Sequence, residues 1–197
     1  MVKPRNRKGS LAPTGSSNQI RIIGGAYRGR KLKFPSIDGL RPTSDRVRET
    51  LFNWLQPVLA GASCLDLFAG SGALGLEAAS RGAERVVMLD KSPRVATQIT
   101  ENISLLGAQG VEVNCSDALQ WLTGSGQRFD VVFLDPPFAQ DLLQPCCRLL
   151  DQGGWLGPNA KIYLETNEEK ALPQLPPNWS PLRRKKAGQV CYYLFSC

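Results

Sequence analysis

The sequence predicts an α/β protein whose central sheet is mostly parallel and carries helices on both faces. Three observations support this fold class. Strand-like and helix-like segments alternate from Cys64 onward. The strand-like runs are almost continuously apolar, as expected for strands that are buried on both faces of a sheet. The length of 197 residues, of which 42% are hydrophobic, suits one compact domain with a sizeable core.

The segment before this alternation predicts a small β-hairpin and a helix. QIRII and RKLKF flank GGAYRG, and their basic residues alternate with apolar ones on a period of two, as in an antiparallel hairpin. A helix is expected to begin near Ser44, whose hydroxyl can cap it, with Asp45 and Glu49 near its positive end. One face of this helix is expected to hold Val47, Leu51, Trp54, Leu55 and Val58.

The rest of the chain supplies the core. The predicted parallel strands are SCLDLF, RVVML, VEVN, VVFLD and KIYLE. The predicted helices between them cover about 73–81, 93–106, 118–122 and 139–150. SPLRRKK and QVCYYLF then predict an antiparallel C-terminal hairpin. We expect residues 19–197 to form a single domain, in which the hairpin and helix of residues 19–60 pack on a core of residues 61–197.

Positive charge is concentrated at the N-terminus. Residues 1–50 hold 12 lysines and arginines against 3 aspartates and glutamates, a net of +9, whereas residues 51–197 hold 12 against 14, a net of −2. Residues 1–18 are basic and rich in Pro, Gly and Ser, which predicts a flexible arm. A solvated tail and a polyanion contact explain this arm equally well. The second basic cluster, RRKK at residues 183–186, favours the polyanion.

Several classes of protein are disfavoured by composition. No apolar run approaches the roughly 18 residues of a membrane span, and no secretory signal is present, so we expect a soluble, cytoplasmic protein. The six cysteines are scattered without C-x-x-C spacing, which favours reduced thiols. The chain contains no histidine, so the usual general base and the commonest metal ligand are missing. We expect no metal, and chemistry that relies on carboxylates, backbone groups or a cofactor.

Acidic residues follow four predicted strands at the edge where ligands bind in open α/β sheets. These residues are Asp66, Asp90, Asp117 and Asp135. The first strand also leads into DLFAGSGALG, whose Gly70, Gly72 and Gly75 satisfy G-x-G-x-x-G. Each feature has an ordinary alternative, because a glycine turn can serve helix packing and an aspartate can cap the helix after it. Their occurrence at successive strand ends favours one shared ligand.

The glycine turn alone does not identify that ligand, because nicotinamide cofactors use the same spacing with an acid about 20 residues later. A pyrophosphate needs an open helix N-terminus, whereas Asp66 brings negative charge there and suits a cation. S-adenosylmethionine fits, with its ammonium at Asp66, its ribose at Asp90 and its adenine amine at Asp117. In this order of motifs the chain resembles the class I methyltransferases, which are Rossmann-like. The expected cofactor site comprises Asp66, Phe68, Gly70, Gly72, Asp90, Lys91, Asp117 and Ala118.

The DPPF run suits methylation of an exocyclic amine. Asp135 and the carbonyl of Pro136 can accept the two amine hydrogens, and the two prolines stiffen the backbone and remove competing N–H donors. Phe138 can stack on the base. The catalytic set is therefore Asp135, Pro136, Pro137 and Phe138. Enzymes acting on adenine N6, cytosine N4, guanine N2 and glutamine amides share this motif; aspartate in the first position tilts it toward guanine.

Longer stretches of the sequence carry a closer resemblance. RIIGGAYRGRKL, LRPTSDRVRETLFNWL, DLFAGSGALGLEAASRGA, LDPPF and GQVCYYLF together resemble the bacterial 16S ribosomal RNA guanine-N2 methyltransferases of the RsmD type. The resemblance runs from about residue 20 to the C-terminus. It implies methyl transfer from S-adenosylmethionine to a guanine of small-subunit rRNA, guanine 966, with S-adenosylhomocysteine as product. The partner is then 16S rRNA or a small-subunit particle, and the enzyme is cytoplasmic; we expect a monomer.

Two basic segments are candidates for contact with RNA. The hairpin offers Arg28, Arg30 and Lys31. The segment before the first helix offers Arg41, Thr43 and Arg46, and these three match the family. For the second segment, a helix cap with salt bridges explains the same residues equally well. Two other functions remain open, an adenine-N6 DNA methyltransferase and a catalytically silent RNA-binding module on the same fold.

Overall fold

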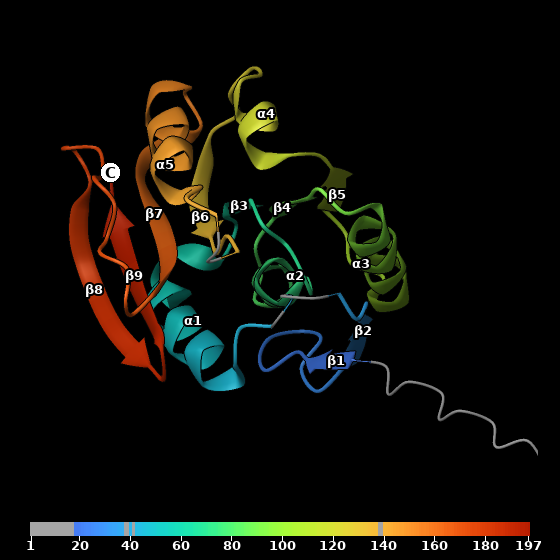
Figure 1. Ribbon diagram of the computed structural model, residues 1–197. Coiled ribbons are helices and arrows are strands. Elements are labelled where there is room, and N and C mark those ends of the chain that lie inside the picture. Colours follow the sequence, from blue (N-terminus) through green and yellow to red (C-terminus); the bar gives the residue numbers. More distant parts are fainter. Residues whose placement is uncertain (1–17, 38–39, 41, 138–139) are drawn as a thin grey trace, which may run out of the picture.

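A computed structural model describes residues 18–37, 40, 42–137 and 140–197 (Figure 1). Seven strands form one sheet in the order β5-β4-β3-β6-β7-β9-β8. The strands of this sheet are β3 (Ser63–Asp66), β4 (Arg85–Asp90), β5 (Val111–Cys115), β6 (Phe129–Leu134), β7 (Leu156–Asn167), β8 (Ser180–Ala187) and β9 (Val190–Ser196). The pairs among β3 to β7 are parallel, and β9 lies antiparallel between β7 and β8. The predicted α/β class and its C-terminal antiparallel hairpin are confirmed.

The helices cover both faces of this sheet, because alternate residues of each strand point to opposite sides. One face packs against α1 (Asp45–Leu59), α2 (Ala73–Ser80) and α3 (Pro93–Leu106). The other face packs against α4 (Ala118–Leu122) and α5 (Leu143–Gln152). Within β6, Val131 and Phe133 belong to the first core and Val132 and Leu134 to the second. A strand with two buried faces explains why the predicted strands read as continuous apolar runs.

The N-terminal hairpin forms a separate two-stranded sheet of β1 (Asn18–Arg21) and β2 (Lys31–Phe34). Its period of two is confirmed, since Ile20, Leu32 and Phe34 are buried while Lys31 and Lys33 are exposed. The apolar side lies over the core that contains α2 and α3. The basic side is left facing solvent.

The buried face of one helix and the start of another differ from the prediction. In α1 the buried stripe follows Val47, Leu51, Leu55 and Leu59 at a spacing of four, so Val58 lies beside it and is 39% exposed. Trp54 is partly buried and stacks on Tyr192 with ring centroids 5.5 Å apart. Helix α5 begins at Leu143 and not near 139; ahead of it, the Gln140 N–H donates to the Pro137 carbonyl (3.0 Å).

Two further predictions concern the whole chain. All six cysteines are free, and burial raises the pKa of Cys64 and Cys146 to about 12, so these thiols stay protonated and unreactive. Within the described ranges, no helix is both long and apolar enough to cross a membrane.

Candidate functional site

The carboxyl ends of β3, β4 and β6 bring three of the predicted aspartates to one edge of the sheet. Because these neighbouring strands are parallel, Asp66, Asp90 and Asp135 leave the sheet on the same side. The pKa of Asp66 is raised to about 7, chiefly by burial and also by the charges of Asp135 and Asp90. Asp135 and Asp90 are therefore close enough for their charges to act on Asp66, as expected for groups that converge on one site.

The glycine loop between β3 and α2 uses its glycines for backbone shape and close packing. Gly72 caps α2 with a φ of 76°, in the left-handed region that strains other residues. A Cβ on Gly75 would lie 2.4 Å from Met88 Sδ, so only glycine lets α2 approach β4 this closely. The ordinary alternative is thus correct for these two glycines. The same turn also leaves the loop backbone beside Asp66 and Asp90.

Asp66 lies beneath this loop and is only 1% exposed. Its Oδ2 accepts a hydrogen bond from the Gly75 N–H (3.1 Å), and the backbone of Phe68 also helps to keep its pKa from rising further. The side chain is therefore too deep to present itself openly to a ligand, although its charge acts on the loop above it. Direct contact with a methionine ammonium remains a prediction.

Asp90 ties the glycine loop to the following turn. Its Oδ2 accepts from the Gly70 N–H (3.0 Å), and its Oδ1 accepts from the Ser92 N–H (2.8 Å). Asp90 is partly exposed, and an ionised carboxylate has about four acceptor positions. Its remaining lone pairs can therefore take further donors, such as two vicinal hydroxyls.

Asp117 is the N-cap of α4, which is the ordinary role that the sequence suggested as an alternative to ligand binding. Its Oδ1 accepts from the Leu119 and Gln120 N–H groups at 3.0 and 3.1 Å. The side chain is exposed, and its Oδ2 receives no hydrogen bond from the described residues. Of the other two residues predicted at the cofactor site, Lys91 is exposed and Ala118 is buried. The cap does not prevent Oδ2 from binding a ligand.

Asp135 is held by the segment that leads into α1. The Thr43 hydroxyl donates to its Oδ2 (3.3 Å), and burial raises the pKa of Asp135 to about 6. Pro136 is buried, and its carbonyl takes no hydrogen bond within the described chain; Pro137 is exposed. The structure thus leaves this carbonyl available as an acceptor next to Asp135. Phe138 lies outside the described residues.

The segment before α1 crosses the candidate site. Leu40 Cδ1 lies 3.8 Å from a Cβ built on Gly70, and the Thr43 hydroxyl bonds to Asp135. The segment therefore lies beside both the glycine loop and the catalytic motif. Arg46 is exposed on α1 and Arg41 falls outside the described residues. A helix cap and salt bridges are present as well, since Ser44 caps α1 and Asp45 pairs with Arg21 and Arg48.

Sequence reasoning missed a further acid at this edge, which is buried. Glu165 is 4% exposed, and its pKa is raised to about 8, chiefly by burial and also by the charge of Asp135. The Tyr163 hydroxyl donates to Glu165 Oε1, two residues away on the same face of β7. The run IYLE contained the signal, because Glu165 follows an apolar strand in the same way as the four aspartates do.

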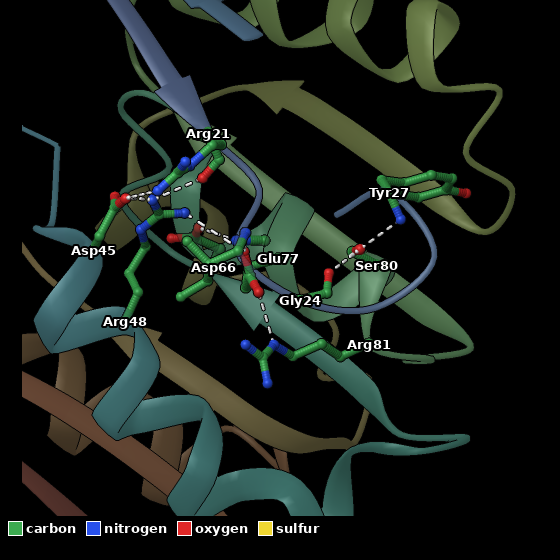
Figure 2. Close-up of polar contacts among 11 residues, drawn as sticks. Arg21, Gly24, Tyr27, Asp45, Arg48, Asp66, Glu77, Ser80 and Arg81 are labelled. Carbon is green, nitrogen blue, oxygen red and sulfur yellow. Dashed lines mark hydrogen bonds and ion pairs between the residues drawn. The ribbon is translucent and has the colours of Figure 1, made fainter. Parts of the chain in front are cut away.

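A buried ion-pair cluster, also missed, ties the N-terminal hairpin to the helix of the glycine loop (Figure 2). Glu77 of α2 is fully buried and accepts from the Ile23 N–H (2.9 Å) and from Arg81 Nε (2.7 Å). Arg48 of α1 is 1% exposed and lies 3.5 Å from Glu77. Its Nη2 donates to the Arg21 carbonyl (2.8 Å).

Backbone contacts complete this junction. The Ser80 hydroxyl donates to the Gly24 carbonyl (2.5 Å) and accepts from the Tyr27 N–H (2.9 Å), as Figure 2 shows. The hairpin is thereby fixed to α2 at several points. The candidate RNA-binding side chains Arg28, Arg30 and Lys31 are all exposed beyond this junction. Their contact with RNA remains a prediction.

Comparisons with known proteins agree with this geometry. The family model described as Conserved hypothetical protein 95 matches residues 20–196. Ribosomal RNA small subunit methyltransferase D of Escherichia coli (strain K12) is 51% identical over 179 residues, which cover 91% of this chain and 90% of the relative. A solved structure from Escherichia coli is 49% identical with a TM-score of 0.86, covering 91% of this chain and 98% of that one.

A more distant relative shares the fold. The structure of an RNA methyltransferase from Salinibacter ruber in complex with S-adenosyl-L-homocysteine is 20% identical, with a TM-score of 0.60, and the match covers 79% of this chain and 93% of that chain. That likeness shows the fold; the family is shown by the family model and by the 51% identity to the Escherichia coli enzyme over most of both chains. The chain belongs to the RsmD-type family of ribosomal RNA small subunit methyltransferases.

Proposed function

We propose that this protein transfers a methyl group from S-adenosylmethionine to the exocyclic N2 amine of a guanine in small-subunit rRNA, guanine 966 by resemblance. The observation that carries the proposal is the position of Asp135. It lies at the carboxyl edge of the sheet, held by Thr43 and close to the glycine loop, next to a Pro136 carbonyl that accepts no hydrogen bond from the described residues. The partner is 16S rRNA or the small-subunit particle, and the enzyme would work as a cytoplasmic monomer.

The acids of the rim suit a cationic cofactor. Positive charge would favour the ionised forms of Asp66 and Asp135, whose pKa values burial raises to about 7 and about 6. S-adenosylmethionine is such a cation, and when bound it supplies an electrophilic methyl group. Asp90 would take the ribose hydroxyls and Asp117 Oδ2 the adenine amine, while buried Asp66 would act through its charge. A protein of the same fold, the RNA methyltransferase from Salinibacter ruber, binds S-adenosyl-L-homocysteine, the product form of this cofactor.

Asp135 and Pro136 would orient the guanine amine. An ionised carboxylate accepts but does not donate, so Asp135 can take guanine N1–H and one N2 hydrogen, and the Pro136 carbonyl can take the other. This arrangement aims the nitrogen lone pair at the methyl carbon. When bound, S-adenosylmethionine would supply the methyl carbon, and its sulfur would keep the electron pair of the carbon–sulfur bond; Asp135 would accept the surplus amine proton. Positioning of this kind can supply several kcal/mol of the barrier.

The test is single-turnover methyl transfer to matched RNA hairpins that carry guanine or adenine, with mass analysis of the product nucleosides. Asp135→Asn replaces one acceptor oxygen by a donor amide that would face a guanine donor, a mismatch of about 1–3 kcal/mol. Guanine activity should then fall about tenfold to a hundredfold, whereas adenine, whose N1 accepts, should suffer less.

Asp130→Asn is the matched control. Asp130 lies at the opposite end of β6, where its Oδ2 accepts from the Ser63 N–H (2.8 Å), a bond that asparagine can keep. The control should retain full activity. An Asp135→Asn enzyme as active on guanine as the parent would refute the proposed role. Methyladenine as the main product would favour the adenine-N6 alternative, and no product from the parent would favour a silent RNA-binding module.

A further inference from the structure

The outer strand of the sheet, β8, carries a run of four basic residues. Every residue of 180–186 is exposed, including Arg183, Arg184, Lys185 and Lys186. Lys186 forms an ion pair with Glu168. Among the described residues, the other three basic side chains have no carboxylate partner. Their charge is therefore available to an external anion.

The basic end of β8 lies at the same edge of the sheet as Asp135. Because β9 is antiparallel to both β7 and β8, β8 runs in the direction of β7 and of its parallel partner β6. Contacts at the strand ends agree, since Lys186 pairs with Glu168, just past the end of β7. Three strand spacings separate β8 from β6, which places the basic strand about 14 Å to one side of the catalytic motif.

The N-terminal hairpin also carries positive charge, but far from β8. Figure 1 shows β8 as the outermost strand and the β1–β2 hairpin far from it, with α1 between them. Arg28, Lys31 and Lys33 of the hairpin segment are exposed. The segment that carries Arg28 and Arg30 contacts the C-terminal ends of α2 and α3, at the edge of the sheet away from Asp135. Of these two cationic surfaces, the basic strand β8 is therefore the one that lies at the same edge as the catalytic motif.

Edge protection alone is a weaker account of β8. Sheet edges are often guarded by lysine or proline, which discourages pairing with another strand. In β8, however, the Arg184 guanidinium lies over the Tyr193 ring at 5.6 Å, and Tyr193 stacks on Phe195 with centroids 6.2 Å apart. A planar guanidinium held on an aromatic ring is preorganised to bind phosphate or to stack on a base.

We propose that β8 is a second RNA-docking strand, on which Arg183, Arg184 and Lys185 contact backbone phosphates of the substrate rRNA beside the catalytic rim. This inference rests on the proposed rRNA substrate. It adds a surface distant from the N-terminal hairpin and assigns the C-terminal hairpin a role in holding RNA.

The experiment compares two variants that each lose two charges. Arg183→Gln/Lys185→Gln removes two unpaired cations from β8. Arg128→Gln/Arg148→Gln removes two exposed arginines elsewhere, one before β6 at the opposite edge of the sheet and one on α5. Binding of deproteinised 16S rRNA is measured by filter retention at several KCl concentrations, with S-adenosylmethionine affinity measured by calorimetry.

The slope of log affinity against log salt should become shallower by about 1.5 for the β8 variant, because each lost phosphate contact removes about 0.7–0.9. The Arg128/Arg148 control should keep the parent slope, and S-adenosylmethionine affinity should be unchanged in both. An unchanged slope in the β8 variant, or equal losses in both variants, would overturn the proposal. So would a β8 variant that binds naked rRNA normally but binds the small-subunit particle weakly, because the strand would then dock a protein.

Failure of the underlying function would look different. If the parent protein itself neither binds nor methylates 16S rRNA, the rRNA substrate is wrong and β8 has lost its partner. If the parent binds and methylates and only the β8 prediction fails, the proposed function stands and this strand is an ordinary guarded edge.

Discussion

Glu77→Ala is expected to destabilise the protein by about 3–5 kcal/mol, because it breaks a buried ion pair by removing one partner. Glu77 is fully buried, and Arg48 is 1% exposed. Within the described chain, the Arg48 Nε and Nη1 atoms already lack hydrogen-bond partners. Without Glu77, Asp45 would be the only carboxylate of the described residues that pairs with Arg48, at 2.5 Å. The Ile23 N–H and Arg81 Nε would lose their acceptor as well.

The loss is measured by urea denaturation at neutral pH, with hydrogen exchange at Ile23 as a local readout of hairpin opening. Glu112→Ala is the control, since it breaks the exposed Arg85–Glu112 pair (2.9 Å) and should change stability by less than about 1 kcal/mol. Arg48→Met/Glu77→Leu removes both buried charges and should be more stable than Glu77→Ala alone. A Glu77→Ala variant no less stable than Glu112→Ala would show that this cluster does not hold the hairpin.

Three further predictions address the rim. Burial raises the pKa of Asp66 from 3.8 to about 7, so the folded chain retains a proton that the unfolded chain releases, and stability falls as pH rises from about 4 to 7. Asp66→Asn should therefore match the parent at pH 4 and exceed it by about 4 kcal/mol at pH 8 in urea titrations; equal stability at pH 8 would argue against the raised pKa. Gly75→Ala places its Cβ 2.4 Å from Met88 Sδ and should lower stability by about 1–3 kcal/mol, with partial recovery in Gly75→Ala/Met88→Ala; thermal melts that show no loss would disprove the close approach. Asp90→Ala should weaken S-adenosylmethionine binding at least about tenfold in calorimetry, the equivalent of one charge-assisted hydrogen bond, and more than Asp117→Ala does; the reverse order would reassign the ribose site.

The parts of the structure that sequence predicted best are those in which one local pattern decides the outcome. β6 is buried on both faces, so its apolar run identified it, and its direction then placed Asp135 at the edge. The same logic located Asp66 and Asp90. The β1–β2 alternation likewise follows from one exposed and one buried face.

The features that sequence missed depend on partners from distant segments. An arginine on α1 reads as a surface residue, yet Arg48 is buried because Glu77 lies 29 positions later on α2. Thr43 read as a candidate RNA contact, but its hydroxyl bonds to Asp135, 92 positions away. The start of α5 was placed about four residues too early, since the helix begins at Leu143. Only the fold brings these groups together.

The protonation behaviour of the rim gives an independent reason to expect a cationic ligand. Burial raises the pKa of Asp66 to about 7, of Asp135 to about 6 and of Glu165 to about 8. Among the described residues, no lysine or arginine lowers any of these values, since Arg48 is taken up by Glu77 and Asp45.

Like charges confined in one buried site cannot all ionise without a counter-charge. The negative pyrophosphate of a dinucleotide would add to the negative charge of the site and raise the pKa values of Asp66, Asp135 and Glu165 further. A sulfonium with an ammonium would lower them and let Asp135 ionise, which is the form in which it accepts hydrogens from the amine. Cofactor binding and activation of the base-binding carboxylate would then be one electrostatic event, and the order of binding would follow from it, with the cofactor before the guanine.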